Sequence, residues 1–400
     1  MSILRNVGSL AATSGLTGAL ILFSSTAPSW LLSDDAYGRY SQFYVATSIG
    51  LILFGAGLNV AYTYFIGQKE LSANRINLYL RRQDYASAAL WGLLAIASWS
   101  STLLNPAIIY GLGASVLFIR ATNIPSIYLG KGDIHRHNTS QLLRPLLVAV
   151  FVLTWAITPF KTENSLYGHF LLASASVFII AALYTKNATR GIATPLNEVR
   201  PQILLRYGLH GLASNLTYTL GQRGYVFIFA FFNLNAASGA FFLVLAFLEA
   251  FLLFPSAAGR YLFARASSGT ASRTLTLSLL TGAIAFTLAL NLFLWLTLDL
   301  IKNYGTSLHH LALDILLESI PLQLTMLALR ILSQMLTGFG LIRYTTIGST
   351  ACASLSLSLG FVLIPAMGVE GAILSMLAGN LLNLIIVAYA FRKTPLGTSK

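Results

Sequence analysis

Apolar residues run through this sequence in long stretches separated by short polar breaks. A helix needs about 20 mostly apolar residues to cross a bilayer, and twelve stretches approach or exceed that length. The pattern therefore predicts an all-α polytopic membrane protein with about twelve transmembrane helices. The expected spans are 8–31, 41–66, 85–104, 107–130, 141–160, 166–185, 203–232, 237–262, 274–298, 309–337, 344–364 and 370–391.

Composition supports the same class. Of the 400 residues, 56% are hydrophobic and only 9% are charged, whereas a soluble domain carries about 25% charged residues. The longest polar stretch, Lys186–Pro201, is a loop rather than a domain. The single cysteine, Cys352, lies in an apolar run, so an internal disulfide is ruled out. Arg5 and the apolar run after it also resemble a signal peptide, but we expect this segment to be retained because it has a counterpart in the second half.

The formal net charge of +13 is explained by where the Lys and Arg residues lie. Cytoplasmic loops of membrane proteins are enriched in these residues, and almost all of them fall on one side of the expected spans. The opposite side has only Arg39, Lys161 and Lys302. The asymmetry places both termini in the cytoplasm and needs no nucleic-acid partner. The basic side holds Arg5, Lys69, Arg75, Arg81, Arg82, Lys131, Arg136, Arg144, Lys186, Arg190, Arg200, Arg206, Arg260, Arg265, Arg273, Arg343, Arg392, Lys393 and Lys400.

Internal similarity divides the chain into two halves. Leu31–Gly38 aligns with Phe232–Gly239 at an offset of 201 residues, and Gly130–Ile134 aligns with Gly338–Ile342 at an offset of 208. Repeats of this kind mark many transporter folds. We expect two six-helix pseudo-repeats around a central cavity. Their limits are 1–187 for the first half, 188–202 for a cytoplasmic linker and 203–400 for the second half.

Three arginines remain inside expected spans: Arg120, Arg223 and Arg330. A charge near the bilayer centre costs about 2.5–3.5 kcal/mol on insertion scales, so each is a candidate functional residue. Arg223 lies roughly 15 Å and Glu249 roughly 21 Å from the outer end of their hairpin, at 1.5 Å per residue. The two are therefore within reach of each other, and a neutralising ion pair is the structural alternative to function.

Other polar features have simple structural explanations. Ser33 or Asp34 can cap the helix that follows. Tyr37 and Tyr40 suit an aromatic belt at the membrane interface. No carboxylate–histidine cluster completes a metal site, so no metal, cofactor or catalytic residue is expected.

Two segments resemble one transporter family. The stretch LLSDDAYGRYSQFYVATSIGLILFGAGLN is similar to the family's first loop, "P-x-x-L-[ST]-x-x-x-YG-x-Y", and LIPAMGVEGAILSMLAGNLLNLIIVAY is similar to its last hairpin. The family is the polysaccharide-transport branch of the multidrug/oligosaccharidyl-lipid/polysaccharide (MOP) exporter superfamily, which includes O-antigen flippases. The matching positions are Pro28, Leu32, Tyr37, Gly38, Tyr40, Pro365, Gly368, Gly371 and Ala372.

The resemblance implies a flippase, not an enzyme. Its substrate would be an undecaprenyl-pyrophosphate-linked oligosaccharide, such as an O-antigen or another surface polysaccharide repeat unit, moved across the bacterial inner membrane. Implied partners are this substrate, membrane lipids, and the polysaccharide polymerase and chain-length machinery.

The chemistry of such a substrate selects the candidate binding residues. Arginine suits a pyrophosphate because its guanidinium stays charged and donates a bidentate fork, and amide side chains suit sugars. The candidates are Arg223, Arg120, Arg330, Gln222, Asn215 and Asn59, with Glu249 as a proton-coupling group or ion-pair partner. Arg120 and Arg330 occupy near-equivalent positions in the two halves, and snorkelling to lipid head groups is their alternative role.

Two other functions stay open. A small-molecule or drug antiporter would share the fold, although such antiporters commonly have an acidic residue in an early helix and the first two spans here contain none. A polytopic polysaccharide polymerase or ligase is less favoured, because such enzymes usually carry a long extracytoplasmic loop.

Overall fold

The computed structural model describes residues 2–392 except 102–104, 193, 196–197, 268–272 and 340. Gly340, Lys393 and Lys400, on which parts of the repeat and charge arguments rest, lie outside this range. The described residues form helices and no strands, which confirms the all-α prediction. The helices are α1 (Ser2–Thr26), the short 3-10 helix η1 (Ala27–Trp30), α2 (Asp34–Gly55), α3 (Leu58–Gly67), α4 (Ala73–Ser101), α5 (Pro106–Gly130), α6 (Ile134–Ile157), α7 (Glu163–Thr189), α8 (Pro201–Arg223), α9 (Tyr225–Phe231), α10 (Asn235–Phe251), α11 (Leu253–Ser267), α12 (Arg273–Tyr304), α13 (Ser307–Glu318), α14 (Ile320–Gly338) and α15 (Ile342–Phe391).

Several expected spans are broken rather than continuous. By length and apolar composition, six of the described helices can cross a membrane alone, and the bent pair α2–α3 makes a seventh. The expected spans 203–232, 237–262 and 309–337 are each divided, at Gly224, Leu252 and Ser319. Apolar residues continue through the break at Leu252, and the polar residues beside Gly224 and Ser319 are too few to end an apolar stretch, so hydropathy alone did not reveal the breaks.

The last two expected spans are joined in one long helix, α15. Gly368 interrupts it with non-helical backbone angles (φ 59°, ψ −129°). A positive φ favours glycine, because a Cβ would clash with the backbone there. The two expected spans are therefore connected by a kink at Gly368 and not by a loop.

The expected span 41–66 differs most from the structure. Its helix already begins at Asp34, with Ser33 capping the first turn by accepting from the Ala36 amide. It then breaks at Ala56 and Gly57, which have φ values of 47° and 65°, and α3 leaves at an angle of 46° to α2. The expected span 41–66 is therefore a bent pair of helices, because two consecutive left-handed residues end α2.

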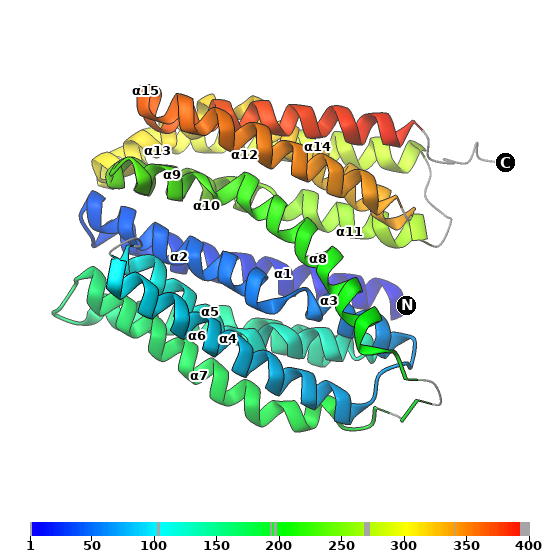
Figure 1. Cartoon of the computed structure of the whole chain (residues 1–400). Coiled ribbons are helices and arrows are strands. Elements are labelled where there is room, and N and C mark those ends of the chain that lie inside the picture. Colours follow the sequence, from blue (N-terminus) through cyan, green and yellow to red (C-terminus); the bar gives the residue numbers. More distant parts are fainter. Residues whose placement is uncertain are drawn as a thin grey trace. The chain divides into compact units, whose positions relative to one another are not determined.

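By packing, the described chain forms two compact units, residues 1–216 and 217–400. In the first unit α5 lies against α2, α3, α4, α6 and α7 (Figure 1). Close approach at Gly111, whose added Cβ would lie 2.3 Å from the Phe43 carbonyl oxygen, lets α5 and α2 pack tightly. The division falls inside α8, downstream of the 188–202 connection.

Tyr37 and Tyr40 lie in the core of this unit. Both are fully buried, and their hydroxyls donate to the carbonyls of Ser25 and Ser24 at 3.0 and 2.8 Å. The expectation that they belong to an interface belt is therefore wrong. They hold the start of α2 against the end of α1.

In the second unit, α14 packs against α11, α12 and α15, and α10 packs against α9 and α13 (Figure 1). Leu329, Leu336, Val387 and Ala390 form one buried cluster between α14 and α15. An added Cβ at Gly259 would lie 2.9 Å from the Arg330 carbonyl oxygen, so α11 and α14 are in close contact.

Replacing Gly57 by alanine tests the break between α2 and α3. The new Cβ would lie 1.9 Å from the Gly208 carbonyl oxygen, at a φ of +65°. Left-handed strain and overpacking together should lower the free energy of unfolding by roughly 2–5 kcal/mol. Thermal unfolding in detergent measures this. Gly55→Ala is the control, since nothing lies within 4 Å of its Cβ position, and equal loss from both variants would contradict the role given to the break.

Candidate functional site

Arg223 and Glu249 form a salt bridge inside the second unit. Arg223 Nη2 lies 2.5 Å and Nε 3.0 Å from Glu249 Oε1. The two side chains are 19% and 37% exposed. A buried charge is tolerated in a membrane helix when a partner neutralises it, and this pair meets that condition while leaving the carboxylate accessible.

Both members of this pair lie beside helix breaks. Arg223 is the last residue of α8, directly before Gly224, and Glu249 lies three residues before the break at Leu252. An added Cβ at Gly224 would lie 2.6 Å from the Leu220 carbonyl oxygen, so glycine permits this break. Discontinuous helices of this kind form substrate and ion sites in transporters.

Arg120 is also paired, with a partner that sequence reasoning missed. Its Nη2 contacts Asp84 Oδ2 on α4, and its guanidinium lies 5.5 Å from the centre of the Phe178 ring. The side chains are only 14% and 16% exposed. Asp84 lies one residue before the expected span 85–104, so it was not considered among the charges inside the spans. The available signal was an acidic residue that closely follows Arg81 and Arg82.

A polar network adjoins this pair. Gln83 Nε2 donates to the carbonyl oxygens of Phe54 and Gly55 at 2.9 and 2.8 Å, and its Oε1 accepts from Asn123 Nδ2 at 2.8 Å. The last carbonyls of a helix have no partner within it, so Gln83 satisfies those freed where α2 ends. Gln83 thus satisfies the end of α2, and the adjacent residue Asp84 neutralises Arg120.

Arg330 has a different environment from Arg120. Its guanidinium lies 4.8 Å from the centre of the Tyr218 ring, and within the described residues its Nε has no hydrogen-bond partner. Among the ion pairs found in that part of the chain, none includes Arg330. The two arginines aligned by the repeat are therefore not chemically equivalent.

The three amide candidates lie in separate surroundings. Gln222 is buried and donates to Asn380 Oδ1 at 3.3 Å, whereas Asn215 is exposed on α8. Asn59 lines a cavity of about 300 Å³ beside Tyr64 and Tyr207.

Tyr64 and Tyr207 form an aromatic platform in that cavity. Their rings stack at 4.8 Å with an interplanar angle of 20°, and the residues are 45% and 38% exposed. Sequence reasoning did not single them out, because α3 and the start of α8 are far apart in the chain. Stacked, accessible rings beside an amide can bind a planar or ring-shaped amphipathic molecule.

No family model matches the sequence, and no curated protein matches it. Solved structures do share its fold. An inward-facing multidrug resistance MATE family transporter of the MOP superfamily has a TM-score of 0.72 at 14% identity, over 94% of this chain and 96% of that one. A MATE protein in complex with MaD3S has a TM-score of 0.63 at 14% identity, over 97% and 95%. A MOP superfamily transporter from Pyrococcus furiosus, for which reverse polarity of the binding pocket suggests a different function, has a TM-score of 0.63 at 15% identity, over 98% and 96%.

These likenesses define the class of fold. The chain is a multi-pass, all-α membrane protein. Its particular fold is that of the MATE transporters of the MOP superfamily, two six-helix repeats, which confirms the predicted fold class. At 13–15% identity the likeness shows the fold alone, and it does not assign the chain to the polysaccharide branch.

A double-mutant cycle tests the Arg223–Glu249 pair. Arg223→Gln, Glu249→Gln and the double variant should give a coupling energy of about 1–3 kcal/mol, less than for fully buried pairs because Glu249 is partly exposed. Unfolding in detergent provides the free energies. The Arg39–Glu163 pair at 2.8 Å, with similarly exposed side chains (36% and 21%), is the control because it lies outside the expected spans, and its coupling should be about 0–1 kcal/mol, as for pairs in contact with water. A smaller coupling for Arg223–Glu249 than for the control would count against an intramembrane ion pair.

A second set of variants separates structure from function at Arg120. Asp84→Asn alone should cost about 3–5 kcal/mol, because it leaves a buried cation without its counter-charge. Asp84→Leu combined with Arg120→Met should recover most of that stability. Unfolding measurements check both values. If transport is lost in the stable double variant, Arg120 serves the substrate; full transport there would assign the pair to structure alone.

Proposed function

We propose that this protein is a transporter that exports an amphipathic small molecule across the membrane by antiport. The observation that carries the proposal is the likeness to MATE multidrug transporters over nearly the whole chain, at a TM-score of 0.72 for one of them. This likeness supports the small-molecule antiporter, the alternative in the sequence analysis, more than the oligosaccharide flippase.

The Arg223–Glu249 pair is our proposed coupling element. Glu249 is the more exposed member of the pair, and we propose that its carboxylate takes up the coupling proton. Protonation removes the charge that holds Arg223, and the arginine then becomes available to another anion. Because the two residues flank the breaks at Gly224 and Leu252, this change acts at the ends of helix segments, where the backbone can reorient.

The Tyr64–Tyr207 platform is a proposed contact for the substrate. Its stacked rings offer apolar area, and Asn59 in the same cavity offers a hydrogen bond. Aromatic rings with a few polar groups are typical of small-molecule sites. Neither a covalent step nor a bound metal is needed for this activity.

A lipid-linked oligosaccharide flippase is the second candidate. Arg330 favours it, since within the described residues this intramembrane cation lies against an aromatic ring and is in no ion pair with a carboxylate. A pyrophosphate would suit such a group. The resemblance of the first loop and last hairpin to polysaccharide transporters points the same way. Under this proposal Arg120, Arg223, Gln222 and Asn215 serve the substrate, and a polysaccharide polymerase is a partner.

For either function we propose the bacterial cytoplasmic membrane, with both termini in the cytoplasm. The bias of Lys and Arg toward one side of the spans supports this orientation. We also propose the division into halves at 1–187 and 203–400, with 188–202 as the linker, on the strength of the aligned segments.

Proteoliposomes distinguish the two functions. With an imposed proton gradient, the antiporter should move a fluorescent amphipathic dye such as ethidium, and Glu249→Gln should reduce the gradient-dependent rate at least about tenfold, because it removes the carboxylate proposed to carry the proton. Glu163→Gln is the control and should keep the rate.

A parallel assay offers the same vesicles a fluorescent undecaprenyl-pyrophosphate-linked oligosaccharide. Gradient-independent flipping of this lipid without dye movement would replace the antiporter by the flippase. Vesicles that move neither compound would contradict both functions.

A further inference from the structure

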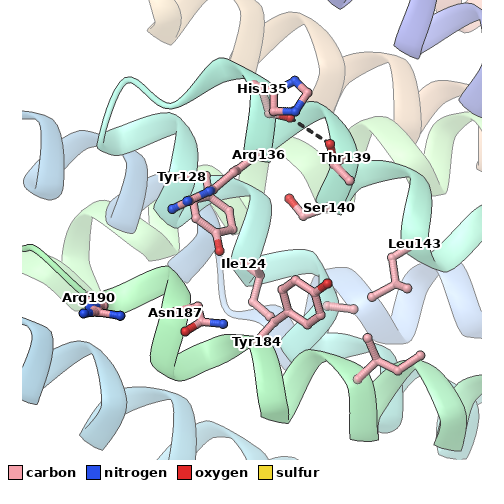
Figure 2. Close-up of a pocket in the computed structure, with 12 residues that line it drawn as sticks. Ile124, Tyr128, His135, Arg136, Thr139, Ser140, Leu143, Tyr184, Asn187 and Arg190 are labelled. Carbon is pink, nitrogen blue, oxygen red and sulfur yellow. Dashed lines mark hydrogen bonds between the residues drawn. The ribbon is translucent and has the colours of Figure 1, made fainter.

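A second cavity, of about 720 Å³, opens in the first unit between α5, α6 and α7 (Figure 2). It lies where α5 ends and α6 begins. Each helix contributes residues spaced three, four or seven apart, as one helix face requires. Tyr128 comes from α5, Arg136 and Ser140 from α6, and Tyr184 and Asn187 from α7.

The mouth of this cavity is positively charged. Arg136 and Arg190 both line it, and none of the described lining residues is acidic. Arg136 extends toward Tyr128 (Figure 2). Its nearest carboxylate, Asp133, is 3.6 Å away in a pair whose arginine side chain is 61% exposed, and such exposed pairs contribute little. Within the described residues no hydrogen bond or ion pair of the Arg190 guanidinium is found.

The turn that precedes α6 carries a cation, Lys131, and an anion, Asp133. The carboxylate of Asp133 caps the first turn of α6 by accepting from the Arg136 amide at 3.1 Å, so it offsets the partial positive charge of this helix end. Lys131 holds the turn in place by donating from Nζ to the carbonyl oxygens of Ala188 and Arg190 at 3.2 and 2.7 Å. Burial, and then repulsion from Arg136, lower the pKa of Lys131.

The deeper wall of the cavity is apolar. Ile124, Leu143 and Ile180 line it. Beyond Leu143 the same face of α6 continues as a stripe of exposed apolar side chains: Leu146, Val150, Leu153 and Ile157 are 48%, 45%, 54% and 79% exposed. In a membrane protein such a stripe faces lipid, so the charged mouth and the lipid-facing surface are continuous.

From this arrangement we propose that the cavity binds an anionic phospholipid. Its phosphate-bearing head group lies between Arg136, Arg190 and Asn187, and one acyl chain follows Leu143 and the stripe on α6. Arginine recognises phosphate oxygens in a bidentate manner. A free phosphate would use the cations but leave the apolar wall unoccupied. The head group of a zwitterionic lipid also carries a cation, and no carboxylate lines the cavity to pair with that cation. The site is independent of the transported molecule and of the proposed function.

Lipid binding to the detergent-purified full chain tests this proposal. Native mass spectrometry should show phosphatidylglycerol binding at least about tenfold more tightly than phosphatidylcholine. Arg136→Gln combined with Arg190→Gln should weaken phosphatidylglycerol binding about 30-fold, since each basic residue near an anionic surface contributes a comparable share. Arg81→Gln combined with Arg82→Gln is the control. It removes the same charge from exposed positions on α4 and should change binding less than about twofold.

A second measurement does not depend on the arginine variants. A photoreactive phenylalanine in place of Leu143 should cross-link phosphatidylglycerol in nanodiscs, whereas the same group in place of Leu93, which is 65% exposed on α4, should cross-link it much less. Equal cross-linking at both positions overturns the proposal. So does equal loss of binding in the control variant. Inorganic phosphate that binds as tightly as phosphatidylglycerol identifies a free-phosphate site and overturns the lipid assignment.

Discussion

Charge neutralisation inside the membrane is the constraint on which the rest of the structure depends. An ionised side chain in hydrocarbon must find a partner or reach water. Arg120 has Asp84 and Arg223 has Glu249, while Arg330 lies over the Tyr218 ring. The three arginines are therefore stabilised in three different ways: by a mostly buried carboxylate, by a carboxylate that is partly exposed, and by an aromatic face. Only the second arrangement leaves its anion accessible, which is why we assign coupling to it.

Helix breaks are the second organising feature, and they depend on the same polar groups. A break in a membrane helix frees backbone groups that water cannot reach, so side chains must satisfy them. Gln83 does so for α2. The breaks at Gly224 and Leu252 place Arg223 and Glu249 at segment ends rather than in rigid mid-helix positions. Polar side chains and irregular backbone therefore occur together, and the candidate site lies where they coincide.

The fold class could be predicted from the sequence because hydropathy and the number of apolar stretches report directly on membrane insertion. The breaks could not. Gln222 and Arg223 are too few to end the apolar stretch 203–232, and the left-handed angles of Ala56 and Gly57, which accompany close packing against Gly208, have no hydropathy signal. The depth of Arg223 and Glu249 correctly suggested that they were within reach. Asp84 was missed because it lies just outside an apolar run, and the Tyr64–Tyr207 stack was missed because it joins helices distant in the chain.

The position of Gln83 also has a consequence for the order of assembly. During synthesis, α2 and α3 leave the ribosome before α4, so the carbonyls of Phe54 and Gly55 enter the membrane region without the amide that later satisfies them. These two carbonyls gain their side-chain donor only when α4 has been made, and Asn123 of α5 then donates to Gln83. Asp84, the next residue of α4, pairs with Arg120 of the same α5 helix. The polar contacts at the end of α2 therefore connect it with α4 and α5, and they can form only after both of these later helices have been synthesised.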